Sequence, residues 1–353
     1  MPLIPIFLIW FSGWAVYRLL RGTNAQLDVA GFCSAWLLGG GIVFAVYYVH
    51  MMFLQANPSP LIFAVTAIAG AALMAIDRKR LSLLVDLRET LSTERLAGGL
   101  LVLMLTIMLG IAAFSGFNND PMRLWMGRGF VYTATPDYTF HLDRGDLPTI
   151  EHNVYPPLII HLYQWQQVFT DRDNTLGMKL PVLLSFPAML GFVYAFLKRA
   201  SLTRPLRWTT LFATLPIYWS DAPYGAADIT TAAFLIGVVW WLWSYLEHGD
   251  HEQLWMAGIF AGLLTVVKQE GVILVGCVFV ALIYVALRDS TVRPRVRFAV
   301  VSVLMGGVIG FASWYPLAFS YPGNPSDFSL NAFDIALLPE IALAIVRVLG
   351  EPW

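Results

Sequence analysis

Long apolar runs recur along this sequence and limit what it can fold into. A run of about 18 or more apolar residues is long enough for a helix to cross the hydrocarbon core of a bilayer. Only 13% of the 353 residues are charged, whereas soluble domains contain about 25%. We therefore expect an all-α polytopic membrane protein, a bundle of about 10–11 transmembrane helices. The expected spans are residues 3–20, 29–54, 60–77, 97–117, 175–198, 208–220, 229–246, 254–268, 271–287 and 298–319, with a weaker one at 333–349.

The chain is expected to have two parts. Residues 1–96 form an N-terminal membrane segment of three helices, followed by a cytoplasmic interfacial helix over residues 81–96, where an apolar stripe lies opposite Arg and Glu. Residues 97–353 form the remaining transmembrane core. Cys33 and Cys277 fall inside apolar runs, where cysteine usually acts as a small hydrophobe, so we expect neither a disulfide nor a metal site.

The distribution of basic residues over the connections predicts the orientation. Alternating spans place fifteen Lys and Arg residues on one side of the membrane and six on the other. This alternation requires that residues 156–170 do not span, and we expect a surface or half-inserted helix there because the run is short and ends polar. The basic side faces the cytoplasm. The long connection over residues 118–174 is therefore predicted to be external.

This external connection begins with residues 117–158, which mix charged and aromatic side chains. A loop of this length in a compact protein is usually functional or disordered, and its aromatic residues give this one the means to fold. We expect an ordered lid with short juxtamembrane helices. Asp120 lies between Asn119 and Pro121, a pattern typical of a helix N-cap, so its role is either capping or chemistry.

Other residues of the lid carry groups that suit a phosphorylated sugar. Arg123 and Arg128 can grip a phosphate, and the face of Trp125 can stack on a sugar ring. His152 and Tyr155 precede two prolines that fix the backbone before an apolar helix. From the residues alone, this second motif is explained as a rigid helix start.

Three further polar clusters, at residues 220–228, 268–271 and 320–331, fall on the same predicted external face. Asp228 starts a span, and a carboxylate at the mouth of a transmembrane helix indicates function, although a helix N-cap is the alternative. Lys268 and Glu270 lie between two apolar spans with almost no loop. They are either an ion pair that reaches the interface or a cation and a carboxylate at the rim of a cavity, and we favour the cavity.

The order of these motifs resembles a known family. Asp120, Trp125 and Arg128, then HNVYPPL, then GMKLPVLLSFPAMLGFVYAFLKRA resemble the membrane-embedded glycosyltransferases of the GT-C superfamily, which include protein O-mannosyltransferases and lipid A aminoarabinose transferases. YGAADITTA and AGIFAGLLTVVKQEG resemble later blocks of the same pattern, so the likeness covers residues 97–320. It implies an inverting transfer of a sugar from a polyprenyl-phosphate donor to a lipid, glycan or protein acceptor. It also implies an external active site on an integral protein of a bacterial inner (plasma) membrane.

The resemblance assigns roles to particular residues. Asp120 is the expected catalytic base and Asp228 the second carboxylate. Relatives usually carry further helices, so we expect the 97–353 core to be C-terminally truncated or unusually short. The sequence indicates no cofactor and leaves open whether a divalent cation takes part; the partners are the donor, the acceptor and membrane lipids, with no nucleic acid. The residues expected to bind the donor phosphate and sugar are Arg123, Trp125, Arg128, His152, Tyr155, Lys268 and Glu270.

Two other functions fit a polytopic protein of this kind. A transporter or flippase would place ionisable groups near the bilayer midplane, with repeat symmetry between halves. Here the charges gather at one face and no repeat is visible, which favours the enzyme. In a non-catalytic membrane scaffold, the external carboxylates and arginines would tolerate replacement.

Overall fold

The computed structural model describes residues 3–22, 25–76, 90, 92–116, 125–136, 156–171 and 173–319, and its side chains up to Tyr315. Every regular element in these residues is a helix, and seven helical stretches are long and apolar enough to cross a membrane. The protein is therefore an all-α polytopic membrane protein. The helices are α1 (Ile4–Arg21), α2 (Val29–Val49, extended by a π-helical turn at His50–Leu54), α3 (Pro60–Ile76), α5 (Arg95–Phe114), α6 (Gly127–Ala134), α8 (Leu158–Gln167), α9 (Thr175–Leu183), α10 (Ser185–Arg199), α11 (Pro205–Ala213), α12 (Pro216–Asp221), a short 3₁₀ turn (Ala222–Tyr224), α13 (Ala227–His248), α14 (His251–Val267), α15 (Glu270–Arg288) and α16 (Arg293–Phe319).

Each apolar run predicted before residue 320 is helical. The run at 208–220 is divided between α11 and α12, because Pro216 cannot continue a helix and Leu215 before it is extended. α3 and α14 have 17 residues each, fewer than the seven long stretches. The predicted span at 333–349 and most of the predicted interfacial helix at 81–96 lie outside the described residues.

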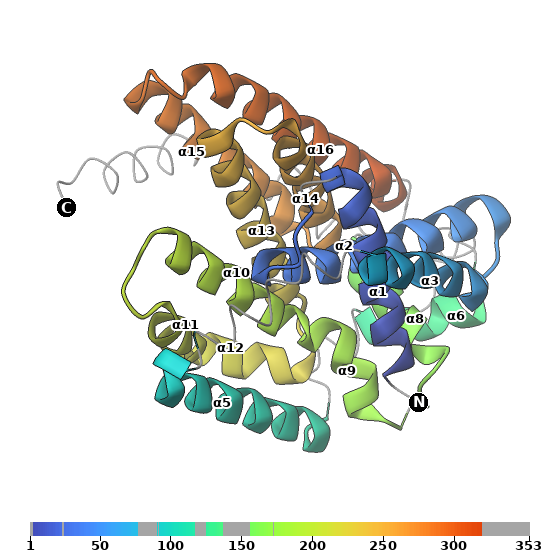
Figure 1. Cartoon of the computed structure of the whole chain (residues 1–353). Coiled ribbons are helices and arrows are strands. Elements are labelled where there is room, and N and C mark those ends of the chain that lie inside the picture. The colour runs from blue at the N-terminus through green and yellow to red at the C-terminus, as the bar shows by residue number, and fades with distance from the viewer. Residues whose placement is uncertain are drawn as a thin grey trace, which may run out of the picture.

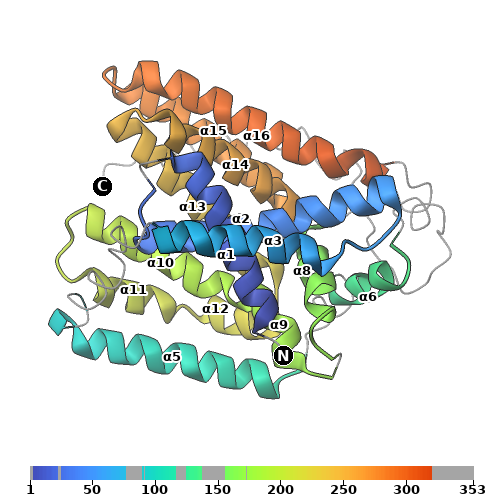
Figure 2. The same ribbon diagram turned by 45° about the vertical axis from the view of Figure 1, so that its right-hand side comes forward.

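The helices form layers around α2. Figure 1 shows α2 near the middle of the bundle, where it packs against α1, α8 and α10. Figure 2 shows α15 and α16 along one edge, and α5 along the opposite edge beside α11 and α12. α5 and α15 keep many apolar side chains exposed, as expected for helices that face lipid.

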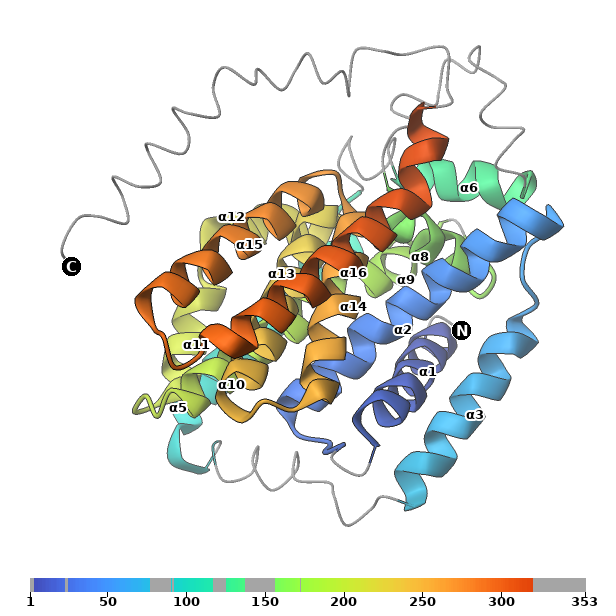
Figure 3. The same ribbon diagram turned by 90° about the horizontal axis from the view of Figure 1, so that it is seen from above.

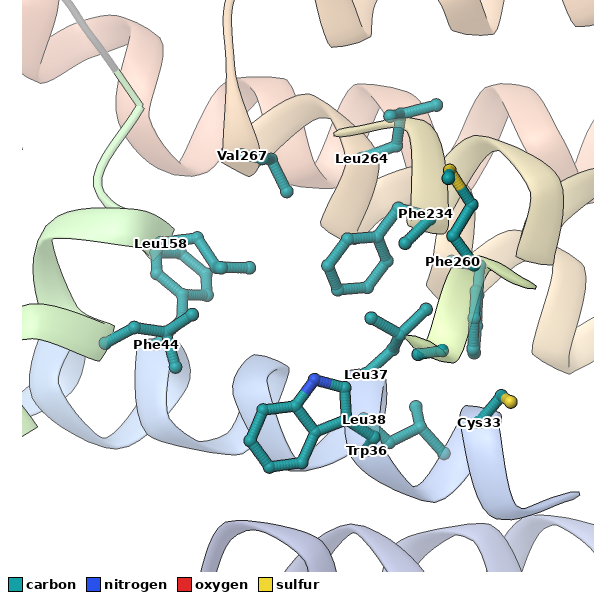
Figure 4. Close-up of a cluster of buried hydrophobic side chains, with 14 of the residues drawn as sticks. Cys33, Trp36, Leu37, Leu38, Phe44, Leu158, Phe234, Phe260, Leu264 and Val267 are labelled. Carbon is teal, nitrogen blue, oxygen red and sulfur yellow. The ribbon is translucent and has the colours of Figure 1, made fainter. Parts of the chain in front are cut away.

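The core lies between α2, α8, α13 and α14. Figure 4 shows Phe234 and Phe260 from α13 and α14 facing Leu37 of α2, with Leu158 of α8 beside Phe44. α14 and α16 approach so closely that a Cβ on Gly306 would lie 1.9 Å from the carbonyl oxygen of Gly258. Small residues permit this backbone contact between membrane helices, where dispersion forces and close packing drive association.

The ends of the helices gather at two opposite ends of the bundle, which Figure 3 shows at lower left and upper right. At the first, which we call the basic end, Arg199 of α10 donates to Glu247 of α13 (2.8 Å) and Arg21 of α1 lies 3.4 Å from Glu252 of α14. The carboxylate of Glu94 there accepts two backbone N–H groups at the start of α11. These contacts bring the ends of α1, α10 and α13 to the same end of the bundle as the starts of α11 and α14, as the predicted alternation of these spans requires. We call the opposite end of the bundle the site end.

α8 does not cross the bundle and does not lie on its surface. All residues from Leu158 to Gln166 are buried, so the first of the two expected positions, on the surface, is wrong, while the half-inserted position stays a prediction. The reason is that α8 packs against α2, α6, α9 and α14 at once. Its polar side chains find partners inside the protein: His161 Nδ1 is 2.9 Å from Gln164 Oε1, and Gln164 donates to Asn57 (2.7 Å).

Candidate functional site

Three residues predicted for the site form one cluster at the site end. Lys268 Nζ lies 2.8 Å from Asp228 Oδ1 and 3.1 Å from Glu270 Oε1. The ammonium therefore bridges the first turn of α13 and the first residue of α15. We call these three residues the Lys268 cluster.

The turn between α14 and α15 places the lysine. Lys268 has an extended backbone (φ −152°, ψ 154°) and ends α14. Its carbonyl accepts the N–H of Gly271 at 2.9 Å, so the chain reverses within three residues. A Cβ on Gly271 would lie 2.1 Å from the carbonyl oxygen of Leu264. Only glycine fits this turn without displacing the backbone.

The start of α13 places the aspartate. The N-cap of α13 is Ala226, which has no capping side chain. Asp228 is therefore not the N-cap, which was the alternative role predicted for it. Its carboxylate lies in the first helical turn, where negative charge is stabilised by the helix dipole. Gly225 turns the chain before it with φ +80°, and Tyr163 of α8 donates to the Gly225 carbonyl at 2.9 Å. α8 therefore fixes the position of Asp228.

The electrostatics of the cluster favour the charged form of Lys268. Burial alone would lower the pKa of Lys268, but the hydrogen bond and charge of Asp228, with the charge of Glu270, outweigh burial and raise it above its ordinary value. The lysine side chain is 16% exposed, whereas the side chains of Asp228 and Glu270 are 50% and 53% exposed. The cluster thus presents two half-exposed carboxylates around a shielded cation. Such carboxylates can accept hydrogen bonds from hydroxyl or amine groups, and the ammonium can exchange one of them for a phosphate.

The structure places Trp125 and Arg128 in the interior. Their residues are 2% and 1% exposed, at the start of α6. α6 packs on α8, where Gly129 contacts Ile160 and Tyr163. Neither side chain is therefore presented at the outer surface, and the assignment of both to the donor site stays a prediction. Asp120, Arg123, His152 and Tyr155 lie outside the described residues.

Sequence reasoning missed the role of Lys179 in α9. This lysine is fully buried, and its ammonium donates to the carbonyls of Ala112, Ser115 and Gly116 at 2.9–3.2 Å. It therefore satisfies the unpaired carbonyls at the C-terminus of α5. The signal in the sequence was a single lysine inside an apolar run.

His161 of α8 was also missed. Its buried ring lies against Tyr47 and Phe44 of α2, with centroids 5.5 and 6.0 Å apart. Gln164 uses its amide N–H on Asn57, so its Oε1 accepts from His161 Nδ1–H. Asn57 in turn donates to the Thr133 carbonyl of α6 at 2.9 Å. This chain of hydrogen bonds connects α8 to α6 through the connection between α2 and α3.

No family model, curated protein or solved structure matches this chain. Its function is therefore inferred from the geometry of the Lys268 cluster and from the resemblance of its sequence motifs.

Proposed function

We propose that the protein is a glycosyltransferase that moves a sugar from a polyprenyl-phosphate donor to a lipid, glycan or protein acceptor at the external membrane face. The Lys268 cluster is the observation that carries this proposal. Asp228 and the Lys268–Glu270 pair come from two separate blocks of the motif pattern, and they are in direct contact at one end of the bundle. Two exposed carboxylates beside a cation, at the mouths of membrane helices, suit a substrate that has a hydroxyl, a phosphate and a membrane-embedded tail.

The proposed reaction needs no external reductant or oxidant. The acceptor oxygen forms a bond to the anomeric carbon of the sugar as the bond from that carbon to the phosphate oxygen breaks. A carboxylate takes the proton of the acceptor hydroxyl and later releases it to water. The products are the glycosylated acceptor and the polyprenyl phosphate.

Asp120 is assigned the role of the base, and the Lys268 cluster the role of binding the donor. The ammonium of Lys268 stabilises the negative charge that grows on the leaving phosphate. Asp228 and Glu270 hold the ammonium in place before the donor binds, and they accept hydrogen bonds from the sugar. Arg123, His152 and Tyr155 are assigned to the same donor site, as are Trp125 and Arg128, whose buried side chains line it from the interior.

A donor assay tests this proposal. Membranes that contain the protein are incubated with a series of labelled polyprenyl-phosphate sugars, and consumption of each is followed. One donor is expected to be consumed, and Asp120→Asn is expected to slow transfer by about 10²–10⁴-fold, the usual cost of losing a general base. Asp221→Asn serves as the matched control, because Asp221 lies in the same connection as Asp228 and its carboxylate bonds to Ser220. If no donor is consumed, or if a folded Asp120→Asn protein keeps its rate, the proposal is wrong.

The orientation of the site is tested separately by cysteine labelling. The protein without its native cysteines receives a single cysteine at Ser220, near the Lys268 cluster, or at Ser201, at the basic end; both positions are exposed. A membrane-impermeant thiol reagent added outside the cell is expected to label the first and not the second. The opposite pattern would place the cluster on the cytoplasmic side, where an exported acceptor is absent.

A further inference from the structure

A cavity of about 730 Å³ lies at the basic end of the bundle. Its floor includes the buried side chains of Arg21, Trp241 and Gln253, from α1, α13 and α14, and its rim includes the exposed Lys198 and Asp250. Pockets of about 300–1,000 Å³ are typical of small-molecule sites. Because α13 begins at the Lys268 cluster and ends at this cavity, the two sites lie at opposite ends of the bundle.

Three polar atoms on the floor have neither a hydrogen-bond partner nor an ion-pair partner among the described residues. They are Arg21 Nε, Trp241 Nε1 and Gln253 Oε1, and each of these residues is at least nine-tenths buried. Buried polar atoms in proteins are almost always hydrogen-bonded, because leaving one unpaired is costly. The cavity therefore offers two buried donors and one buried acceptor to a ligand.

The donors are held in fixed positions. The guanidinium carbon of Arg21 lies 5.3 Å from the centre of the Trp241 ring, and its Nη1 is 3.4 Å from Glu252 Oε2. Cation–π contact and the ion pair thus orient the guanidinium, while its Nε stays available to an acceptor. A rigid pair of neighbouring N–H donors suits the oxygens of a phosphate.

Two of the acidic residues that line the cavity are already bonded within the protein. Asp28 accepts the N–H of Gly31 at 2.7 Å and caps α2. Glu247 is paired with Arg199, whose guanidinium also lies 5.2 Å from the Trp240 ring centre. Asp28 and Glu247 are therefore engaged by other groups, and the third acidic residue of the lining, Asp250, lies at the exposed rim.

We propose that this cavity binds a phosphate ester that also carries a hydroxyl or amine group. The phosphate oxygens accept from Arg21 Nε and Trp241 Nε1, and the hydroxyl or amine donates to Gln253 Oε1. The headgroups of phosphatidylethanolamine and phosphatidylglycerol have this chemistry, as does soluble glycerophosphate. A choline headgroup has no N–H to donate to Gln253, and arginine side chains already lie over the rings of Trp240 and Trp241. We therefore expect discrimination against phosphatidylcholine.

The experiment measures binding to the purified full chain in detergent. Short-chain phosphatidylethanolamine, phosphatidylglycerol, phosphatidylcholine and glycerophosphate are titrated, and the dissociation constant is obtained from the shift in thermal unfolding. The ethanolamine and glycerol lipids are expected to bind at least about tenfold more tightly than the choline lipid, the usual effect of about one charged or buried hydrogen bond. Glycerophosphate binding as tightly as the lipids identifies a soluble ester as the ligand, whereas binding of the lipids alone identifies a headgroup.

Two variants test which atoms bind the ester. Arg21→Gln is expected to weaken binding of all the esters about tenfold or more. Gln253→Met is close in shape to the native side chain and removes the amide that carries the acceptor, so it is expected to abolish the preference over phosphatidylcholine. Arg297→Gln is the control, because Arg297 is an exposed arginine at the same end and does not line the cavity.

The proposal has clear contrary results. If the wild-type protein is not stabilised by any of the four compounds, the cavity holds only water. If Gln253→Met, folded as judged by its unfolding without ligand, discriminates between the lipids as the wild type does, the assignment of Gln253 is wrong and the proposal fails. This second variant keeps the test decisive even if Arg21→Gln does not fold.

Discussion

Lys268 Nζ lies 2.8 Å from Asp228 Oδ1, although 40 residues separate them along the chain. The contact joins the start of α13 to the end of α14, at the point where α15 also begins. Since both carboxylates of the cluster are about half exposed, the pair itself adds little stability. Its position at the mouths of three helices is the reason for the donor-binding role proposed above.

The α14–α15 turn offers the first test. Gly271→Ala is expected to displace the turn, because its Cβ would lie 2.1 Å from the Leu264 carbonyl oxygen. Overpacking of this kind costs about 1–3 kcal/mol of unfolding free energy, and moving Lys268 is expected to lower transfer activity as well. Gly276→Ala is the control in the same helix, since a Cβ there meets nothing within 4 Å. Thermal unfolding in detergent compares the two, and equal stabilities would show that the turn adapts to a side chain.

Lys179 offers a second test, which concerns its hydrogen bonds to the C-terminus of α5. Lys179→Met keeps the length of the side chain but leaves the carbonyls of Ala112, Ser115 and Gly116 without their donor. Each unpaired buried carbonyl costs about 1–3 kcal/mol, so the unfolding temperature is expected to fall clearly. The exposed Lys198 supplies the control, and Lys198→Met is expected to change the unfolding temperature little. A Lys179→Met protein as stable as the wild type would mean that water or other groups replace the ammonium.

The buried His161 is expected to make the free energy of unfolding depend on pH. Burial lowers its pKa to about 4, although the hydrogen bond with Gln164 acts in the opposite direction. The unfolded chain, with a pKa of 6.5, binds a proton between pH 6.5 and about 4 that the folded protein does not bind. The unfolding free energy therefore decreases as the pH falls through this window, by on the order of 3 kcal/mol, and this contribution is constant below it.

This pH dependence is measured by chemical unfolding at a series of pH values. His161→Phe removes the titrating group and keeps an aromatic ring among Tyr47 and Phe44. Its unfolding free energy is expected to change less than that of the wild type between pH 6.5 and 4. Parallel curves for the two proteins would show that His161 titrates normally in the folded state.

The helices could be predicted from the sequence because each apolar run is long and bounded by polar residues. The position of the Lys268 cluster could be predicted for a similar reason. Alternating spans place the start of α13 and the α14–α15 turn at the same end of the bundle, so Asp228, Lys268 and Glu270 were expected on one face of the membrane. The sequence did not show that Lys268 bridges both carboxylates, since this depends on the sharp turn at Gly271.

The interior position of α8 could not be predicted. Its residues include His161, Gln164 and Gln166, which are typical of a surface but are buried. His161 bonds to Gln164 within α8, and Gln164 in turn donates to Asn57 outside the helix. Lys179 is a similar case, because its partners are the carbonyls of α5, far away in sequence. Burial of a polar residue depends on its tertiary partners, and a hydropathy pattern does not contain them.

The central claim is that Asp228 and Lys268 act as one unit on a lipid-linked sugar. The most direct test compares the transfer rates of four purified proteins: wild type, Asp228→Asn, Lys268→Met and the double variant. Each single variant is expected to lose about 10²-fold in rate. The double variant is expected to be no slower than the slower single variant, because residues in one network are not additive. Four folded proteins that transfer at the same rate would contradict the claim.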